Sequence, residues 1–383
     1  MNISDELRQR LLEKGAGIVG FADLSGIAEQ DRHGYGYGIT IAIPLAPEIV
    51  SGIRNGPTRE YYEHYQGINT LLNELDEYAA GILRENGYEV LPMTQSLVSI
   101  DESTRRTQLP HKTVATRAGI GWIGKCALLV TEEYGSAVRI SSVLTNAVLD
   151  AGTPVNETRC GECMVCRDSC PAGAVSGIPW KAEMDRDEFY NAFTCRKTAR
   201  ERSAEIGVDE SLCGLCIRLC PWTEKYLRKS IRMQTGGLEL LPQVKPLWEG
   251  LREHHAQISE YFSESILNRV FEDREADFTT KAGDHIFKVE LAFTGESKSP
   301  CGYCISSLGR DGTGEVESIF VSDVCRGLMI GDLLMKNALD WMDANKAAKK
   351  RISVMAGNDV LGFYERYGFK TRLNVLEQIK PVV

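Results

Sequence analysis

The sequence predicts an α/β multidomain protein: an α/β domain over residues 1–150, a cysteine-rich module over 151–235 and a second α/β domain over 242–383. Three observations support this organisation. The chain has 383 residues, enough for two or three domains with their own cores. Apolar strand-like runs alternate with helical patterns toward both ends of the chain. Between them lie eight of the twelve cysteines.

The N-terminal domain begins with an amphipathic helix in the first 15 residues. A second, longer helix is predicted over residues 58–88 and ends near Gly87. Buried or half-buried strands are predicted from three apolar runs, at residues 16–24, 35–45 and 137–149.

Composition and charge narrow the class of protein. The chain is 43% hydrophobic and 25% charged, as globular proteins are. A net charge of −9 offers no basic surface for a polyanion, so nucleic acid is not an expected partner. No apolar run approaches the roughly 20 residues that span a bilayer, and no membrane contact is expected. We therefore expect a cytoplasmic protein, in which clustered cysteines indicate metal binding or catalysis.

The clustered cysteines form two runs that each end in Cys-Pro. The first has the spacing C-x2-C-x2-C-x3-C-P and consists of Cys160, Cys163, Cys166 and Cys170. The second consists of Cys195, Cys213, Cys216 and Cys220. Two such runs are the signature of a ferredoxin-like module with two [4Fe–4S] clusters. A zinc ribbon, the alternative, gives no reason for the third cysteine or for two Cys-Pro pairs.

In such modules the fourth cysteine of a run ligates the other cluster, which divides the thiolates into two sets. Set A consists of Cys160, Cys163, Cys166 and Cys220. Set B consists of Cys170, Cys195, Cys213 and Cys216. Each set supplies one soft anionic ligand for each tetrahedral iron of a cubane.

A glycine-rich stretch precedes the cysteines, at residues 109–145. Gly119, Gly121 and Gly124 permit close backbone approach to a flat ligand or to a neighbouring chain segment. The stretch fits neither the dinucleotide nor the phosphate-loop pattern. Cys126, which follows it, is predicted to be a small buried residue or to lie near a cofactor.

The segment ATRAGIGWIGKCALLVTEEYGSAVRISSVLT, followed by the double-cluster module, resembles the epoxyqueuosine reductase family, as does GPTREYYEHYQGIN at 56–69. More distantly it resembles the cobalamin-dependent reductive dehalogenases. The resemblance covers about residues 1–235 and implies a cobalamin reduced by electrons from the clusters. Its contacts would be Gly119, Gly121, Trp122, Gly124 and Lys125. Whether the corrinoid is retained stays open, because the chain lacks a D-x-H-x-x-G motif but family members bind without one.

A reductive reaction needs a proton donor, and the resemblance points to Asp101, in the pair Ile100-Asp101. The connection after it, ESTRRTQLPHK, is several residues longer than in the family. His111 and Lys112 are therefore alternative donors. The plainer interpretations are a solvated loop acid for Asp101 and a helix-starting pair for the other two.

The C-terminal part follows a predicted linker at 230–245. Helices are expected to about residue 275, followed by three strands, a long helix at 325–350, a further strand and a short helix. This order resembles the GNAT acyltransferase fold over about 242–383.

That resemblance implies a site for acetyl-CoA or another acyl-CoA. A strand would pair with pantetheine, and the turn before the long helix would hold the pyrophosphate at a helix N-terminus. Met329 stands where the family has a glycine. Tyr364 would protonate the leaving thiolate, and Glu315 or Glu317 would act as base. The remaining predicted contacts are Ile319, Val321, Arg326, Gly327, Gly331 and Asn358.

Together these features predict an iron–sulfur oxidoreductase, cobalamin-dependent if the resemblance holds, fused to an acyl-CoA-dependent N-acyltransferase. The expected partners are a small-molecule substrate and an external electron donor such as ferredoxin or flavodoxin. The tRNA-acting reductases carry a helical-repeat domain where this chain has the GNAT-like one. The alternative is an electron-transfer protein whose GNAT-like domain only binds or senses acyl-CoA.

Overall fold

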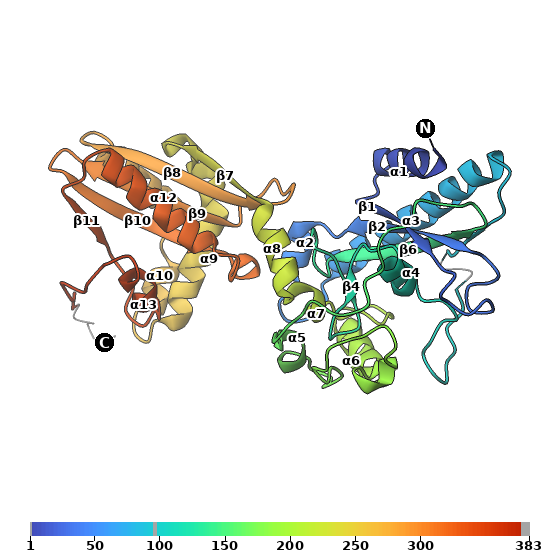
Figure 1. Cartoon of the computed structure of the whole chain (residues 1–383). Helices are drawn as coiled ribbons and strands as arrows, with labels where there is room; N and C mark the ends of the chain where they lie inside the picture. Colours follow the sequence, from blue (N-terminus) through green and yellow to red (C-terminus); the bar gives the residue numbers. More distant parts are fainter. Residues whose placement is uncertain (1, 95–97, 377–383) are drawn as a thin grey trace. The chain divides into compact units, whose positions relative to one another are not determined.

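The computed structural model describes residues 2–94 and 98–376, and the chain divides between Lys229 and Ser230 into two compact units (Figure 1). The first unit contains the predicted α/β domain together with the cysteine-rich module, and the boundary between those two near residue 150 stays a prediction. In the described ranges, no helix is both long enough and apolar enough to cross a membrane.

The first unit is built on a four-stranded antiparallel sheet with the order β1-β2-β6-β3. Its strands are β1 (Ile18–Asp23), β2 (Tyr37–Pro44), β3 (Val90–Pro92) and β6 (Val138–Thr145). The helices packed against it are α1 (Ile3–Glu13), α3 (Arg59–Glu85) and α4 (His111–Arg117). The predicted strands and both predicted helices of this region are confirmed.

Alternation of side chains along β6 separates the two faces of this sheet. Ser141 Oγ donates to Asp76 Oδ1 of α3 at 2.6 Å, so α3 covers one face. Leu144 packs with Val114 of α4 on the other face. Burial raises the pKa of Asp76 to about 8, with a smaller opposing effect of the Ser141 hydrogen bond. This interior acid is therefore mostly protonated at neutral pH.

The cysteine-rich part consists of short elements connected by loops. A two-stranded ribbon, β4 (Trp122–Ile123) and β5 (Leu129–Val130), packs against it. The remaining elements of this unit are α2 (Pro47–Gly52), α5 (Val165–Asp168), η1 (Arg186–Glu188), α6 (Ala192–Glu205), α7 (Leu215–Arg218) and α8 (Pro221–Lys229). Trp122 and Trp222 meet edge to face, with ring centroids 4.9 Å apart, and join the ribbon to the start of α8.

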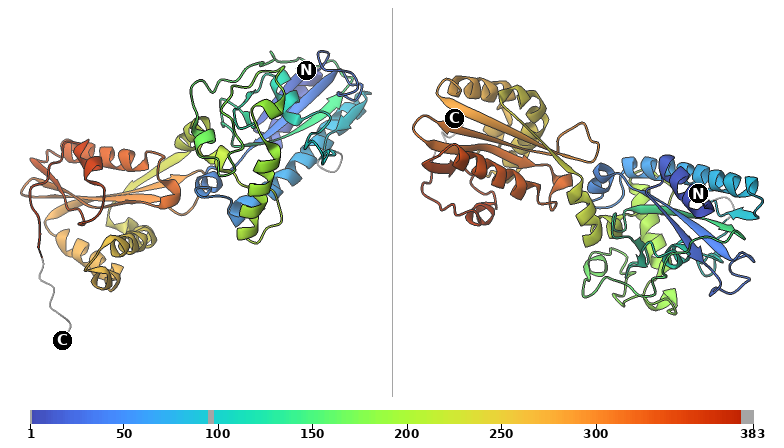
Figure 2. Two further views of the ribbon diagram at one scale, coloured as in Figure 1. Left: turned by 90° about the horizontal axis from the view of Figure 1, so that it is seen from below. Right: turned by 45° about the horizontal axis from the view of Figure 1, so that its top comes forward.

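The second unit is a five-stranded sheet with the order β11-β10-β9-β8-β7, antiparallel except for the β10–β11 pair. Its strands are β7 (Ile231–Gly236), β8 (His285–Thr294), β9 (Gly302–Gly309), β10 (Thr313–Val321) and β11 (Lys349–Ile352). Its helices are η2 (Leu238–Leu240), α9 (Leu241–Ile258), α10 (Ser263–Leu267), α11 (Phe271–Lys281), η3 (Asp323–Cys325), α12 (Ile330–Ala344) and α13 (Leu361–Glu365). Helix α12 lies along one face and α9 along the other (Figures 1 and 2).

The predicted linker at 230–245 is wrong, because most of it belongs to the second unit. Residues 231–236 form edge strand β7, which pairs with β8, and α9 begins at Leu241. The pair Gly236-Gly237 suggested a linker but forms only the turn between these elements. The strand is short and half-buried on alternate residues, which gives a weak apolar signal.

Candidate functional site

The eight predicted cluster ligands all belong to the cysteine-rich part of the first unit, and several of their thiols are neighbours. All eight are half-buried free thiols. The Cys220 thiol interacts electrostatically with Cys160, and the Cys195 thiol with Cys170 and Cys213. These neighbours agree with sets A and B, including the exchange of the fourth cysteine. Among the described residues, no three or more His, Cys, Asp or Glu side chains surround a position for one metal ion.

Lys125 holds the loop that carries set A. Its side chain is 1% exposed. Nζ donates to Gly161 O at 2.8 Å and to Cys163 O at 3.0 Å, and it lies 3.6 Å from Met164 Sδ. The sequence suggested a cofactor contact for Lys125. Its contacts in the structure are with the loop between the first cysteines, so it acts on the ligands through their backbone.

The glycine-rich stretch approaches neighbouring chain segments, one of the two alternatives that the sequence left open. A Cβ on Gly119 would lie 2.5 Å from Thr153 O, and one on Gly121 would collide with Val130 O. A Cβ on Gly124 would lie 3.0 Å from Val130 Cγ2. Glycine is needed at Gly119 and Gly121 because the backbones touch there. Trp122 is 0% exposed.

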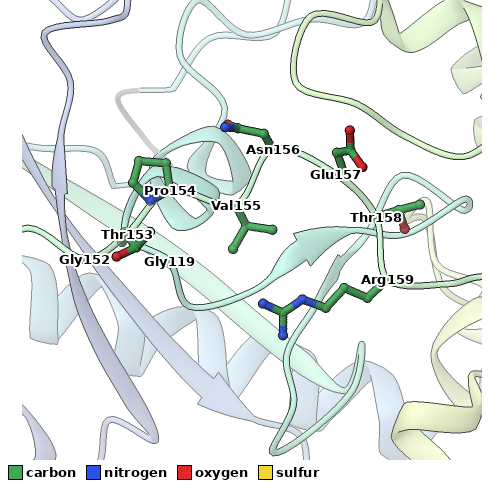
Figure 3. Close-up of a pocket in the computed structure, with 10 residues that line it drawn as sticks. Gly119, Gly152, Thr153, Pro154, Val155, Asn156, Glu157, Thr158 and Arg159 are labelled. Atoms are coloured by element: carbon green, nitrogen blue, oxygen red, sulfur yellow. The ribbon is translucent and has the colours of Figure 1, made fainter.

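Next to Gly119 the surface is hollowed. The hollow has a volume of about 610 Å³, is open to solvent and is lined mainly by residues 152–159 (Figure 3). Of the five residues predicted to contact a corrinoid, Gly119 alone lines it. Direct contact between a corrinoid and the other four residues stays a prediction. Their packing against neighbouring chain segments does not favour it.

The predicted proton donor Asp101 lies on an exposed loop. Its carboxylate accepts hydrogen bonds from Ser103 N and Oγ, both at 2.7 Å, which lower its pKa. Arg106 of the same loop pairs with Asp185 at 2.6 Å and with Asp187 at 2.9 Å. Asp101 therefore caps its own turn, as a solvated loop acid does, and its role as donor is still untested.

The alternative donors His111 and Lys112 begin α4. Lys112 Nζ donates to Ala127 O at 2.8 Å, and burial lowers the pKa of Lys112 to about 8. Burial, with a smaller contribution from Arg139, lowers the pKa of His111 to about 4. Its Nδ1 is buried without a hydrogen-bond partner among the described residues. At neutral pH His111 is thus neutral and Lys112 is the stronger candidate for giving up a proton.

The second unit has an open strand edge at β10. Strand β11 pairs with Thr313–Val316 only, and a register shift follows at Val316/Ser318. Beyond that point β10 pairs with β9 alone, and Ser322 N donates to Cys301 O. By alternation, the backbone groups of Ile319 and Val321 point away from β9, to the open edge. Arg326 Nε donates to Val321 O at 3.2 Å.

Helix α12 begins beside this edge. Met329, its N-cap residue, has a φ of 62°, in the left-handed region that favours glycine. Gly327 also has a positive φ, of 84°. A Cβ on Gly331 would touch the ring of Phe363 at 3.7 Å. Asp332, which sequence reasoning missed, lies in the first turn and accepts a hydrogen bond from Tyr367 Oη at 2.8 Å.

The predicted catalytic groups of this unit, Tyr364 and Glu317, differ in whether their side chains are available for proton transfer. Tyr364 is half-buried, and burial raises its pKa to about 12, so it is protonated at neutral pH. Glu317 is 5% exposed and pairs with Lys281 and Arg274, and it accepts from Ser307 Oγ at 2.5 Å. These donors occupy the carboxylate that would serve as base.

The remaining predicted groups of the second unit are Glu315 and Asn358. Burial alone would raise the pKa of Glu315, but hydrogen bonds from Arg351 and Lys281 outweigh it and lower the pKa. Asn358 lies in the turn before α13 and donates its backbone N–H to Met355 O. Its predicted contact with acyl-CoA stays untested.

Comparison with known families identifies a domain in the cysteine-rich part and another in the second unit. Residues 159–223 match the model of a 4Fe-4S double cluster binding domain, and residues 248–369 match the acetyltransferase (GNAT) family. The chain joins a double-cluster domain to a GNAT domain. The resemblances noted in the sequence and the predicted fold class are thereby confirmed.

Curated relatives of the chain include epoxyqueuosine reductases. The protein of Atelocyanobacterium thalassa is 30% identical over 169 residues, 42% of this chain and 53% of the relative. That of Bacillus anthracis is 41% identical over 117 residues, 30% of each chain. The chain thus spans about half the length of the first of these relatives and less of the second.

Solved structures match at lower identity. An epoxyqueuosine reductase with an epoxyqueuosine-modified tRNA stem loop is 19% identical, with a TM-score of 0.41, and the match covers 58% of this chain and 66% of that one. A B12-dependent reductive dehalogenase is 17% identical, with a TM-score of 0.41 and coverages of 55% and 30%. A putative acetyl transferase from Pyrococcus furiosus is 20% identical, with a TM-score of 0.31 and coverages of 39% and 100%. The tRNA stem loop belongs to that neighbour, and the expectation that nucleic acid is not a partner of this chain stays a prediction.

Proposed function

We propose that the chain is an iron–sulfur reductase in which two [4Fe–4S] clusters deliver single electrons to a substrate at the first unit, joined to a GNAT acyltransferase. One observation supports the reductase part: the eight cysteines lie within the segment that matches a double-cluster domain, and Cys220 neighbours Cys160 while Cys195 neighbours Cys170 and Cys213. When bound, the clusters supply one-electron transfer.

The chain's own residues suit such a pair of clusters. Lys125 fixes two carbonyls of the set A loop. Tyr190 donates a hydrogen bond to the set B thiol of Cys195. The edge-to-face pair Trp122 and Trp222 keeps one side of the cysteine region apolar, which restricts water there. Anchored loops and limited water favour electron transfer with little reorganisation.

Loss of one set B ligand tests the assignment. In anaerobically purified Cys195→Ala, we expect one cluster to be lost or converted and the other kept, read by iron content and electron paramagnetic resonance of the reduced protein. Cys301→Ala, which removes a buried cysteine of the second unit, is the control and should keep both clusters. Two intact clusters in Cys195→Ala would contradict the assignment.

Cobalamin is a further part of the proposal, and the resemblance to corrinoid enzymes is its support. The residues that it suggested for contact fit poorly, since Trp122 and Lys125 are buried in protein contacts and Gly121 abuts Val130. Titration with cobalamin, followed by its visible spectrum, tests binding directly. An unchanged spectrum with both clusters intact would leave a cobalamin-free electron-transfer protein.

For the GNAT domain we propose acyl-CoA binding at the open edge of β10 and the first turn of α12. Ile319 and Val321 offer backbone groups for pantetheine, and the N-terminus of α12 offers N–H groups for the pyrophosphate. Tyr364 is protonated and so able to act as general acid. N-acyl transfer to a small-molecule amine is the activity that this arrangement would support.

A second candidate for this domain is acyl-CoA sensing without transfer. The observation that favours it is the saturated carboxylate of Glu317, which would have to leave Lys281 and Arg274 to act as a base. Acetyl-CoA binding with no acyl transfer to any of a panel of amines would support sensing. For the reductase, we propose a small-molecule substrate and an external electron donor such as ferredoxin or flavodoxin.

A further inference from the structure

A half-buried cation without an acid partner lies on β6, next to helix α3. Arg139 stands two residues before Ser141, so its side chain points to the face of the sheet that α3 covers. Its Nε and Nη2 donate to Asn69 Oδ1 at 3.1 and 2.8 Å, and its Cζ lies 4.2 Å from the ring centroid of Tyr65. In the part of the chain that the structure describes, Arg139 forms no ion pair with an Asp or Glu. The guanidinium is therefore fixed in orientation, but its charge is not neutralised.

The amide that holds this guanidinium has an unused donor. Asn69 is 4% exposed, and its Nδ2 is buried without a hydrogen-bond partner among the described residues. Rotating the amide by 180° would turn Nδ2 toward the N–H groups of Arg139, so the orientation of the amide is fixed. A buried donor without an acceptor is destabilising. An acceptor oxygen supplied by a ligand would satisfy it.

This arrangement lies beside the loop that carries part of set B. Ser136 Oγ donates to Cys216 O at 3.3 Å, and the three residues of chain from there to Arg139 span at most about 11 Å. Tyr61, near the start of α3, packs against the same loop, because a Cβ on Gly214 would lie 2.9 Å from its ring. A ligand bound at Arg139 would thus lie close to the predicted set B cluster.

The chemistry of these groups selects the kind of ligand. A guanidinium has five N–H groups in a planar fork that matches the oxygens of a carboxylate or a phosphate. Asn69 Oδ1 accepts from two of them, at Nε and Nη2, and so leaves three for a ligand. The unpaired Nδ2 of Asn69 adds a neutral donor at the same place. One positive charge with several free donors favours an anionic oxygen group.

We propose that Arg139 and Asn69 bind the anionic group, a carboxylate or a phosphate, of the small molecule that the reductase reduces. This inference rests on the proposed function, because it takes the bound molecule to be the substrate. Both residues position that molecule beside set B and take no part in the transfer of electrons. The ring of Tyr65, on the guanidinium, keeps the cation in place.

The test uses the full chain, purified anaerobically, with inorganic phosphate and acetate as probes in separate calorimetric titrations. Wild type should bind at least one probe, and the tighter of the two identifies the anionic group. Arg139→Gln should weaken that binding by about tenfold or more, because a charged donor is lost. Asn69→Asp places a carboxylate against Arg139, so the protein keeps an internal partner for the cation and should bind the probe at least tenfold more weakly, by about the same reasoning. Arg84→Gln, exposed on the same helix, is the control and should bind as wild type does.

The reduced clusters report where the probe binds. We expect the probe to shift the electron paramagnetic resonance spectrum of one reduced cluster in wild type but not in Arg139→Gln, with iron content and urea unfolding showing that each variant is intact. No heat with either probe in wild type, or equal affinity in wild type, Arg139→Gln and Asn69→Asp, would overturn the inference alone. Binding that leaves both cluster spectra unchanged would also overturn it, by placing the anion away from set B. A wild-type chain without iron–sulfur clusters would contradict the proposed function itself.

Discussion

In the first unit, cationic side chains next to the candidate site donate hydrogen bonds to backbone carbonyls. In the second unit, the corresponding cationic side chains form ion pairs with a carboxylate. Lys125 and Lys112 each donate to carbonyls of the segments that carry or touch the cysteines. Lys281 and Arg274 neutralise Glu317, and the open edge of β10 is left to backbone groups. The first site thus depends on buried side chains, and the second on backbone geometry.

The largest effect is expected from removing the ammonium group of Lys125. Lys125→Met keeps the length of the side chain but leaves Gly161 O and Cys163 O without their donor. The loss of these hydrogen bonds from a charged donor should cost about 2 kcal/mol. We also expect the set A cluster to be lost, with iron falling to about half. The control Lys197→Met, at an exposed position of α6, should change neither. Full iron content in Lys125→Met would show that the set A loop keeps its conformation without the hydrogen bonds from Lys125.

The buried acid of the first unit gives a pH-dependent effect. The pKa of Asp76 is about 8 in the folded chain, against 3.8 for an ordinary Asp. The folded state therefore binds more protons in this range, and stability should fall as pH rises from about 4 to 8. The loss expected between pH 5 and 8 is about 3.5 kcal/mol, and it should disappear in Asp76→Asn, measured by urea unfolding. Glu74→Gln, exposed on the same helix, should keep the wild-type slope.

For the backbone-dependent site, Met329→Gly should have a moderate effect. Glycine removes left-handed strain worth about 1 kcal/mol and clears side-chain bulk beside the first turn of α12. Calorimetry should show tighter acetyl-CoA binding. Met329→Ala removes bulk but keeps the strain, and so separates the two causes. Gly331→Trp should weaken binding, and Tyr364→Phe should spare it while slowing transfer. No heat of binding for wild type and Met329→Gly would leave this domain a scaffold.

The smallest effect is expected at Asp332. A carboxylate in the first turn of α12 stabilises the helix but repels a pyrophosphate at the same N–H groups. Asp332→Asn should tighten acetyl-CoA binding by about threefold, about 0.7 kcal/mol. Asp340→Asn, exposed further along the same helix, is the control. Equal affinity in both variants would place the pyrophosphate elsewhere.

Sequence reasoning reached the features that depend on local spacing. The Cys-Pro runs define two ligand sets by spacing alone, and the helical and strand periods of the larger elements survive in the structure. Edge strand β7 was missed because its apolar signal is short and follows basic residues. The partners of Lys125 lie 36 and 38 residues away in the sequence. No local sequence pattern predicts such contacts.

Metal and sulfide analysis of the anaerobically purified wild-type chain tests the central claim most directly. Two [4Fe–4S] clusters require about eight irons and eight sulfides per chain, with broad absorbance near about 400 nm that bleaches on reduction. We expect this result from the eight thiols of sets A and B. About two zinc ions per chain, without sulfide and without that absorbance, would contradict the account.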